Sequence, residues 1–151
     1  MEIRYKSTRN SEVTVTASEA ILQGLAEDGG LFLPTAVPAI DVTALAGKSY
    51  QEIAYEVMRL FLTDYTEEEL KSCIAKAYDD KFDTKEIAPL KEAGGICYLE
   101  LFHGATIAFK DMALSILPHL LTTAAKKQQK KEEIVILTAT SGDTGKAALA
   151  G

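Results

Sequence analysis

The chain has 151 residues, enough for one ordinary domain, and its 47% apolar and 25% charged residues are typical of a soluble globular protein and argue against disorder. The formal net charge of −6 argues against a nucleic-acid surface, which needs clustered cations on one face. The lysines between residues 126 and 131 are followed at once by two glutamates, so we interpret them as the solvated end of a helix. No apolar run reaches membrane-spanning length, and residues 1–10 lack the apolar core of a secretion signal, so we expect a cytoplasmic protein.

The two cysteines, Cys73 and Cys97, lie far apart and match neither a CxxC pair nor a zinc-binding spacing. We expect both to be small buried hydrophobic residues in a reducing compartment. The sequence therefore predicts neither a disulfide framework nor a metal site.

The first half of the chain predicts short strands followed by helices. Residues 2–16 alternate apolar and polar side chains around a polar break, which predicts a pair of short strands. The first helix should carry an apolar stripe as far as Gly29 and Gly30, and residues 31–38, with two prolines, should be extended. The two later helices should form a hairpin, and nothing in this half carries obvious chemistry. Three helix starts are predicted from capping-box pairs, which are Thr16 with Glu19, Ser49 with Glu52 and Thr66 with Glu69.

The composition changes near residue 90, where Gly94 and Gly95 interrupt the chain. CYLEL, residues 97–101, is expected to be a strand, and a helix should run from about 109 to 128 with a bend at Pro118. We take this as the start of a new structural unit.

Residues 133–140, EIVILTAT, are a near-continuous apolar and β-branched run, typical of a strand buried on both faces of a parallel sheet. A loop, SGDTG, then leads into another helix. Strand, helix, strand, loop and helix are the opening of a doubly wound α/β domain. We therefore predict an α/β protein with two parts: residues 1–92, a mixed strand and helix region with the helical hairpin, and residues 93–151, the incomplete βαβα start of a doubly wound domain.

Lys110 stands in an apolar run, LFHGATIAFKDMAL, where a strand hands over to a helix. A helix N-terminus disfavours a cation and an apolar flank such as Ile107 and Phe109 adds a desolvation cost, so both effects favour the neutral amine. A neutral lysine is a competent nucleophile toward an aldehyde, although its stem can also carry the charge out to water. Taken alone, the residues leave both readings open. Asp111, which follows, is explained at least as well by stabilisation of the helix start as by catalysis.

TATSGDTGK, residues 138–146, is rich in glycine and hydroxyl groups and precedes a predicted helix. Such a loop offers N–H and hydroxyl groups to an anion, which favours a carboxylate or a phosphate as ligand. A nucleotide P-loop is excluded because only two residues separate Gly142 from Gly145, and Ala147 stands where the magnesium ligand would be. GxGxxG is also absent, which leaves a nicotinamide site without support.

Two other side chains are weaker candidates for chemistry. Ser141 lacks the glycines two residues to either side that mark a hydrolase nucleophile. His103 follows the predicted strand near the edge where α/β sheets bind ligands, yet a lone histidine is often structural.

Three segments in this order resemble one family, the threonine synthases. Residues 18–34, SEAILQGLAEDGGLFLP, resemble the N-terminal segment of that family, ELFHGATIAFKD resembles its cofactor-lysine segment, and TATSGDTG resembles its substrate-carboxylate loop. Three matches in family order are far more specific than any one alone. The resemblance implies a fold type II enzyme that uses pyridoxal 5'-phosphate (PLP) and converts the small molecule O-phosphohomoserine, with water, into L-threonine and phosphate.

The resemblance also implies roles for individual residues. Lys110 matches the lysine that holds PLP as a Schiff base and then moves protons at the α and β carbons of the substrate. His103 and Thr106 match positions beside the cofactor. The loop that holds the substrate α-carboxylate and lies near the 3-oxygen of the pyridine ring is matched by Ser141, Gly142, Asp143 and Thr144.

The chain departs from the family pattern in two ways. Ala105 stands where the family usually has proline, which puts the positioning of the lysine in doubt. Family members continue well beyond residue 151, with the loop for the PLP phosphate and the partner of the pyridine nitrogen, so we expect an N-terminal fragment that is not catalytically competent by itself.

Alternatives stay open because the chemistry of Lys110 is common to several enzymes. They are a threonine-synthase-like phospholyase, another PLP-dependent eliminating lyase, and a non-catalytic module in which the PLP motif is vestigial. The sequence does not predict an oligomeric state.

Overall fold

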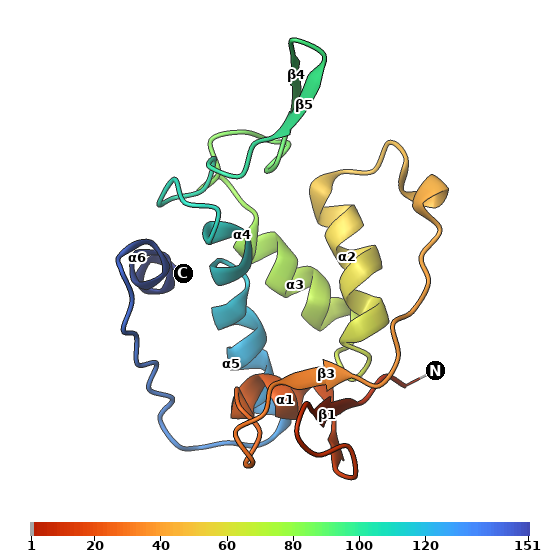
Figure 1. Ribbon diagram of the computed structural model, residues 1–151, viewed down its shortest axis with the longest axis vertical. Helices are drawn as coiled ribbons and strands as arrows, with labels where there is room; N and C mark the ends of the chain where they lie inside the picture. The colour runs from red at the N-terminus through yellow and green to blue at the C-terminus, as the bar shows by residue number, and fades with distance from the viewer. Residues whose placement is uncertain (1) are drawn as a thin grey trace.

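The computed structural model describes residues 2–151 and begins with a three-stranded antiparallel sheet (Figure 1). The central strand β1 (Tyr5–Ser7) pairs with β2 (Thr14–Val15) on one side and with β3 (Phe32–Pro34) on the other. The predicted pair of short strands is confirmed. The segment expected only to be extended adds β3 as an edge strand, where Pro34 can end the strand without breaking a central ladder.

Capping boxes start the first three helices, as predicted. In α1 (Ala17–Gln23), α2 (Tyr50–Phe61) and α3 (Glu67–Ala77), the N-cap hydroxyl accepts from the backbone N–H of the glutamate three residues later, and that carboxylate accepts from the N-cap N–H. The predicted hairpin of α2 and α3 is confirmed, and the short helix η1 (Val42–Leu45) precedes it. Helix α1 ends earlier than predicted, because Gly24 takes a positive φ of 72° and stops the helix there.

Gly94 and Gly95 form the turn of a hairpin between β4 (Leu90–Ala93) and β5 (Ile96–Leu99). Both glycines have positive φ, 61° and 76°, which is the backbone that a two-residue hairpin turn requires. Helices α4 (Asp111–Leu114), α5 (Leu117–Lys127) and α6 (Asp143–Ala150) follow. The predicted bend is confirmed, because the helix is interrupted at residues 115 and 116 and Pro118 lies in the first turn of α5, which needs no N–H from it.

The two strands predicted for a doubly wound sheet do not pair in parallel within residues 2–151. β5 pairs antiparallel with β4, whereas the strand predicted at residues 133–140 is wrong for the described chain, where these residues form no strand and Leu137 is 95% exposed. A parallel strand is buried only when neighbouring strands and helices cover it, and this part of the chain supplies none. The mixed α/β class is confirmed, while the burial predicted from the apolar run is not realised here. Burial is confirmed for Cys73 but is wrong for Cys97, which lies exposed on β5.

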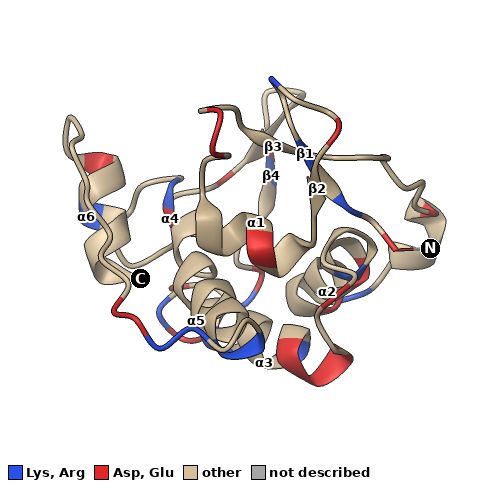
Figure 2. Cartoon of the chain, turned by 90° about the horizontal axis from the view of Figure 1, so that it is seen from below, with Lys and Arg blue, Asp and Glu red and all other residues tan. Residues whose placement is uncertain are grey.

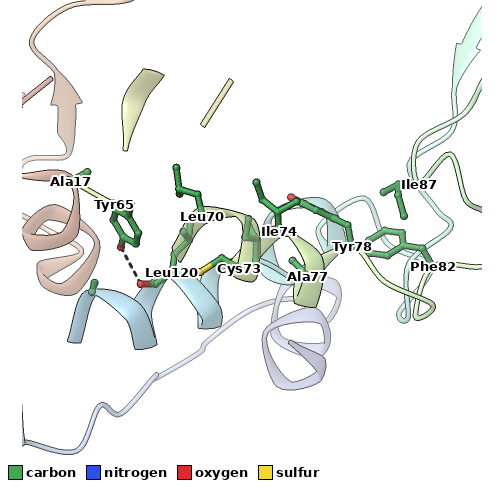
Figure 3. Close-up of a cluster of buried hydrophobic side chains, with 12 residues drawn as sticks. Ala17, Tyr65, Leu70, Cys73, Ile74, Ala77, Tyr78, Phe82, Ile87 and Leu120 are labelled. Carbon is green, nitrogen blue, oxygen red and sulfur yellow. Dashed lines mark hydrogen bonds between the residues drawn. The ribbon is translucent and has the colours of Figure 1, made fainter. Parts of the chain in front are cut away.

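The core forms where α5 packs against α1 and α3 (Figure 3). Leu70, Ile74 and Ala77 form a buried stripe along α3, because residues three or four apart share one face of a helix. Leu120 of α5 faces this stripe, and its backbone carbonyl accepts from the buried hydroxyl of Tyr65 at 3.0 Å. The core thus draws on both predicted parts of the chain, and the division at residues 92 and 93 stays a prediction.

Charged residues gather at the ends of α3 and α5 (Figure 2). The basic end of α5 lies beside the acidic start of α3, where Lys127 Nζ and Glu69 Oε2 are 3.0 Å apart. This confirms that lysines of the predicted basic cluster occupy a solvated helix end. Among residues 2–151 no helix combines the length and the apolar character needed to cross a membrane.

Candidate active site

Lys110 precedes α4, at the end of an irregular segment that runs from the hairpin into the helical layer. Its side chain is half-buried, and Nζ lies 4.4 Å from the centre of the Phe109 ring. Within residues 2–151 no carboxylate lies at ion-pair distance from this amine. The amine is therefore uncommitted to any acidic group of the described chain.

The apolar flank of Lys110 does not desolvate it. Ile107 is 71% exposed and Phe109 is 59% exposed, and α4 has only four residues. The apolar enclosure that the sequence predicted around Lys110 is thus absent from residues 2–151. Apolar side chains lose water only where other groups pack on them, and most of the surface of Ile107 and Phe109 stays exposed.

Asp111, the first residue of α4, is buried and faces backward toward the turn before the lysine. Its Oδ2 accepts from the Thr106 backbone N–H at 2.8 Å, and its Oδ1 accepts from the Thr106 hydroxyl at 2.6 Å. The carboxylate is therefore committed to the turn rather than to solvent or a ligand.

Gly104 and Ile107 show how tightly that turn is closed. A Cβ at Gly104 would lie 2.6 Å from Asp111 Cβ, closer than carbon atoms approach. Ile107 donates its N–H to the Gly104 carbonyl at 3.0 Å and has a φ of 65°, an unusual conformation for a β-branched residue. Such strain persists only where the surroundings impose it, and it is found most often at functional sites.

His103 lies between two carboxylates and is stacked on Phe102. Its Nε2 is 3.0 Å from Glu100 Oε2, and its Nδ1 is 2.5 Å from Asp83 Oδ1. Hydrogen bonds to Glu100 and then Asp83 raise the pKa of His103 above its usual value. The Asp83 N–H also donates to the His103 carbonyl, so the residue ties the loop after α3 to the segment that leads to Lys110. Its predicted place beside a cofactor stays a prediction.

The loop of residues 141–144 leads into α6 and is largely exposed. Gly142 takes a φ of 140°, and the Thr140 hydroxyl oxygen accepts from the N–H groups of Gly142 and Gly145. The N–H groups of Asp143 and Thr144 lie in the first turn, where no intrahelical acceptor exists, and no other acceptor within residues 2–151 takes them. The helix start is therefore open to an anion.

The structure brings α6 and α4 side by side (Figure 1). Lys146 Nζ donates to the backbone carbonyl of Thr106 at 3.2 Å. The helix that follows the predicted anion loop is thereby bonded to the turn that precedes Lys110. Two segments that the sequence separates by about thirty residues belong to one region of the molecule.

Among the residues that contribute to this region, Asp111, Gly104 and Lys146 were not predicted as site residues. Asp111 was equally well explained as a helix-start acid, and Gly104 carried no signal of its own. An acid with a threonine five residues earlier is visible in the sequence, but only the fold shows that the acid is buried and that the two are bonded.

Comparison with known proteins identifies the family. A family model described as threonine synthase N terminus matches residues 4–78. Threonine synthase of Schizosaccharomyces pombe is 40% identical over 162 aligned positions, which cover 99% of this chain and 31% of the relative. The chain belongs to the threonine synthase family.

Solved structures of the family agree with this assignment. The crystal structure described as PLP-bound threonine synthase from Brucella melitensis is 36% identical and matches 99% of this chain and 32% of its own with a TM-score of 0.90. Yeast threonine synthase is 38% identical and matches with a TM-score of 0.88. The human protein named threonine synthase-like 1 is 38% identical over 141 aligned positions, 89% of this chain and 19% of the relative. The chain thus spans about a third of the length of the threonine synthases that it matches.

Proposed function

We propose that this chain supplies the cofactor lysine and the substrate-carboxylate loop of a PLP-dependent threonine synthase, which converts O-phosphohomoserine and water into L-threonine and phosphate. The observation that carries the proposal is the bond between Lys146 of α6 and Thr106, which joins the loop of residues 141–144 to the turn before Lys110. The family assignment over nearly the whole chain supports it.

The donor groups of the chain fit this cofactor and this substrate. Lys110 offers a primary amine without a carboxylate partner among residues 2–151, as a lysine that condenses with an aldehyde requires. The open N–H groups of Asp143 and Thr144 fit a carboxylate, because they stand at the positive end of a helix. When bound, PLP would supply the electron sink for the carbanion formed at the substrate α carbon.

The residues of the chain have separable tasks in this proposal. The Lys110 amine would hold the cofactor through its aldehyde group and would carry protons at the α and β carbons of the substrate. The loop of residues 141–144 orients the substrate by its α-carboxylate, so that these carbons face the lysine. His103 and Thr106 have their polar groups committed within the chain, and we assign them to shaping the lysine segment beside the cofactor.

A second candidate is a threonine-synthase-like phospholyase, which would use the same lysine. The observation that favours this second candidate is the similarity to the human protein named threonine synthase-like 1. The two reactions differ in their products, since a phospholyase would release phosphate and 2-oxobutanoate without threonine.

A chimera tests the reaction. Residues 1–151 replace the aligned segment of the Schizosaccharomyces pombe threonine synthase, and products are measured with O-phosphohomoserine. We expect threonine and phosphate, and we expect Lys110→Ala to abolish both while Lys130→Ala, at the exposed helix end, retains them. Phosphate with 2-oxobutanoate would establish the phospholyase reading instead, and a Lys110→Ala chimera as active as its parent would reject the catalytic assignment.

The chain itself gives a second test through its lysines. PLP and borohydride are added to residues 1–151, and the modified lysines are mapped by mass spectrometry. Modification of Lys110 above that of the exposed Lys130 would show that the chain alone presents the cofactor lysine. Equal modification here, together with an unmodified Lys110 in the chimera, would favour a non-catalytic module with a vestigial motif.

A further inference from the structure

We propose that Thr106, Asp111 and Lys146 form a positioning unit, the Thr106 network. The network holds the turn before Lys110 in one conformation and bonds this turn to α6, the helix that follows the loop of residues 141–144. This inference rests on the proposed function, because it names residues that act through Lys110. In this inference the three residues act by positioning Lys110, whether or not Thr106 also lies beside the cofactor.

Thr106 is the centre of the network because all its polar groups are used within the chain. Its N–H and its hydroxyl both donate to the Asp111 carboxylate, at 2.8 and 2.6 Å, and its carbonyl accepts from Lys146 at 3.2 Å. One residue thus donates to α4, the helix that Lys110 precedes, and accepts from α6, the helix that follows the loop of residues 141–144. A displacement of either helix must act on the same turn.

Burying the polar groups of the Thr106 network costs free energy that their hydrogen bonds must offset. Asp111 is 3% exposed and Thr106 is 6% exposed. A carboxylate so far from water is stable only when its oxygens are bonded, and here both oxygens have Thr106 as a partner. An apolar pair would fill the same space more cheaply but would not specify direction. The network therefore determines the orientation of the turn rather than only its packing.

The backbone of the turn before Lys110 is strained, and the Thr106 network holds it in this conformation. Ile107 has a φ of 65° although its side chain is mostly exposed, so burial of that side chain does not account for the conformation. Gly104 leaves no room for a Cβ beside Asp111. The two bonds from Thr106 to Asp111 close the turn on the C-terminal side of Ala105. The network therefore holds the turn in this strained conformation.

Amide hydrogen exchange on residues 1–151 tests the network without any cofactor. Asp111→Ala should speed exchange of the Thr106 amide by roughly tenfold or more, the size expected when a hydrogen bond to a charged group is lost. The chain offers a matched control, because Asp41 accepts from both the N–H and the hydroxyl of Thr43 at an exposed helix start. Asp41→Ala should speed exchange at Thr43 and leave Thr106 unchanged. An unchanged Thr106 amide in Asp111→Ala would overturn the network.

Kinetics of the chimera test whether the network positions the lysine. Thr106→Val keeps the N–H and removes the hydroxyl donor, and we expect kcat per reactive Lys110 to fall by up to about 10², with KM for O-phosphohomoserine little changed. Thr106→Ser restores the donor and should restore most of kcat. Lys146→Met should lower kcat less, by roughly tenfold, because it removes only the bond to the carbonyl. Asp41→Ala should leave both constants unchanged.

The outcomes separate this inference from the proposed function. A purely structural role would lower the amount of folded chimera but not kcat per Lys110 titrated with PLP and borohydride, and that result would overturn the inference while leaving the function intact. Loss of kcat in Thr106→Val without recovery in Thr106→Ser would also overturn it. If Lys110→Ala retains activity, the proposed function fails, and hydrogen exchange still decides whether the network exists.

Discussion

Gly104 and Ile107 carry no reactive chemistry, yet they determine the shape of the turn before Lys110. The glycine is required by contact, since any side chain there would meet the Asp111 side chain. The isoleucine tolerates a positive φ that isolated chains avoid. At the scale of single residues, the reactive Lys110 amine is therefore recognisable from the sequence. Gly104 and Ile107 are not, although they determine the shape of the turn before it.

The contact at Gly104 gives a sharp test. Gly104→Ala should lower the free energy of unfolding by about 1–3 kcal/mol, because a buried neighbour must shift to admit the methyl group. Urea unfolding of residues 1–151 measures the change. Ala105→Ser, at the exposed neighbouring position, should change it by less than about 0.5 kcal/mol. Equal stability of Gly104→Ala and the parent chain would show that the turn is looser than the structure indicates.

At the scale of elements, helix α3 organises the molecule. It begins at a complete capping box, carries the buried stripe, and contacts both α2 and α5. Its start is also acidic, which favours the positive end of the helix dipole and brings Glu69 to Lys127. The stability of the core therefore depends on where this one helix starts.

Removal of the α3 cap should be measurable. Thr66→Ala should destabilise the chain by about 1 kcal/mol, because the Glu69 N–H loses its acceptor and the reciprocal box is broken. Thr66→Ser keeps the hydroxyl and serves as the matched control. Circular dichroism during urea unfolding reports both variants. A Thr66→Ser variant as unstable as Thr66→Ala would point to the lost methyl group rather than to the cap.

At the scale of the whole molecule, His103 joins two regions that are distant in sequence. It binds Asp83 after α3 and Glu100 after the hairpin, and it leads directly into the lysine segment. Its raised pKa makes this connection dependent on pH. His119 on α5 has its pKa lowered, first by burial, and so depends on pH in the opposite sense.

The sign of the effect follows from which state binds more protons. Because the pKa of His103 is higher in the folded chain than its unfolded value of about 6.5, its contribution is complete below that value and is lost as pH rises through the folded pKa. The parent chain should therefore lose stability as the pH rises above neutral, and His103→Gln should not show this decrease. His119→Gln should instead remove a loss on acidification. Thermal unfolding at several pH values measures both slopes, and a parallel pH profile for His103→Gln and the parent chain would contradict the assigned ion pairs.

The sequence by itself determined the local features of this protein. The three capping boxes, the α2–α3 hairpin, the helix break at Pro118 and the loop before α6 all appear where they were predicted. Each depends on groups three or four residues apart or on the backbone of a single residue, so the local order of side chains is sufficient. The identity of Lys110 and the resemblance to the family were likewise available from the order of the residues alone.

Only the tertiary structure decided which groups meet. The bonds from Lys146 to Thr106 and from His103 to Asp83 join residues 40 and 20 positions apart, and nothing local selects those partners. Burial is equally non-local: residues 134–137 have the composition of a core strand but stay exposed, because no neighbouring strand or helix in residues 2–151 covers them. The local sequence determines which secondary structure a segment can form. Contacts with distant parts of the fold determine which of its side chains are buried and which groups they bond.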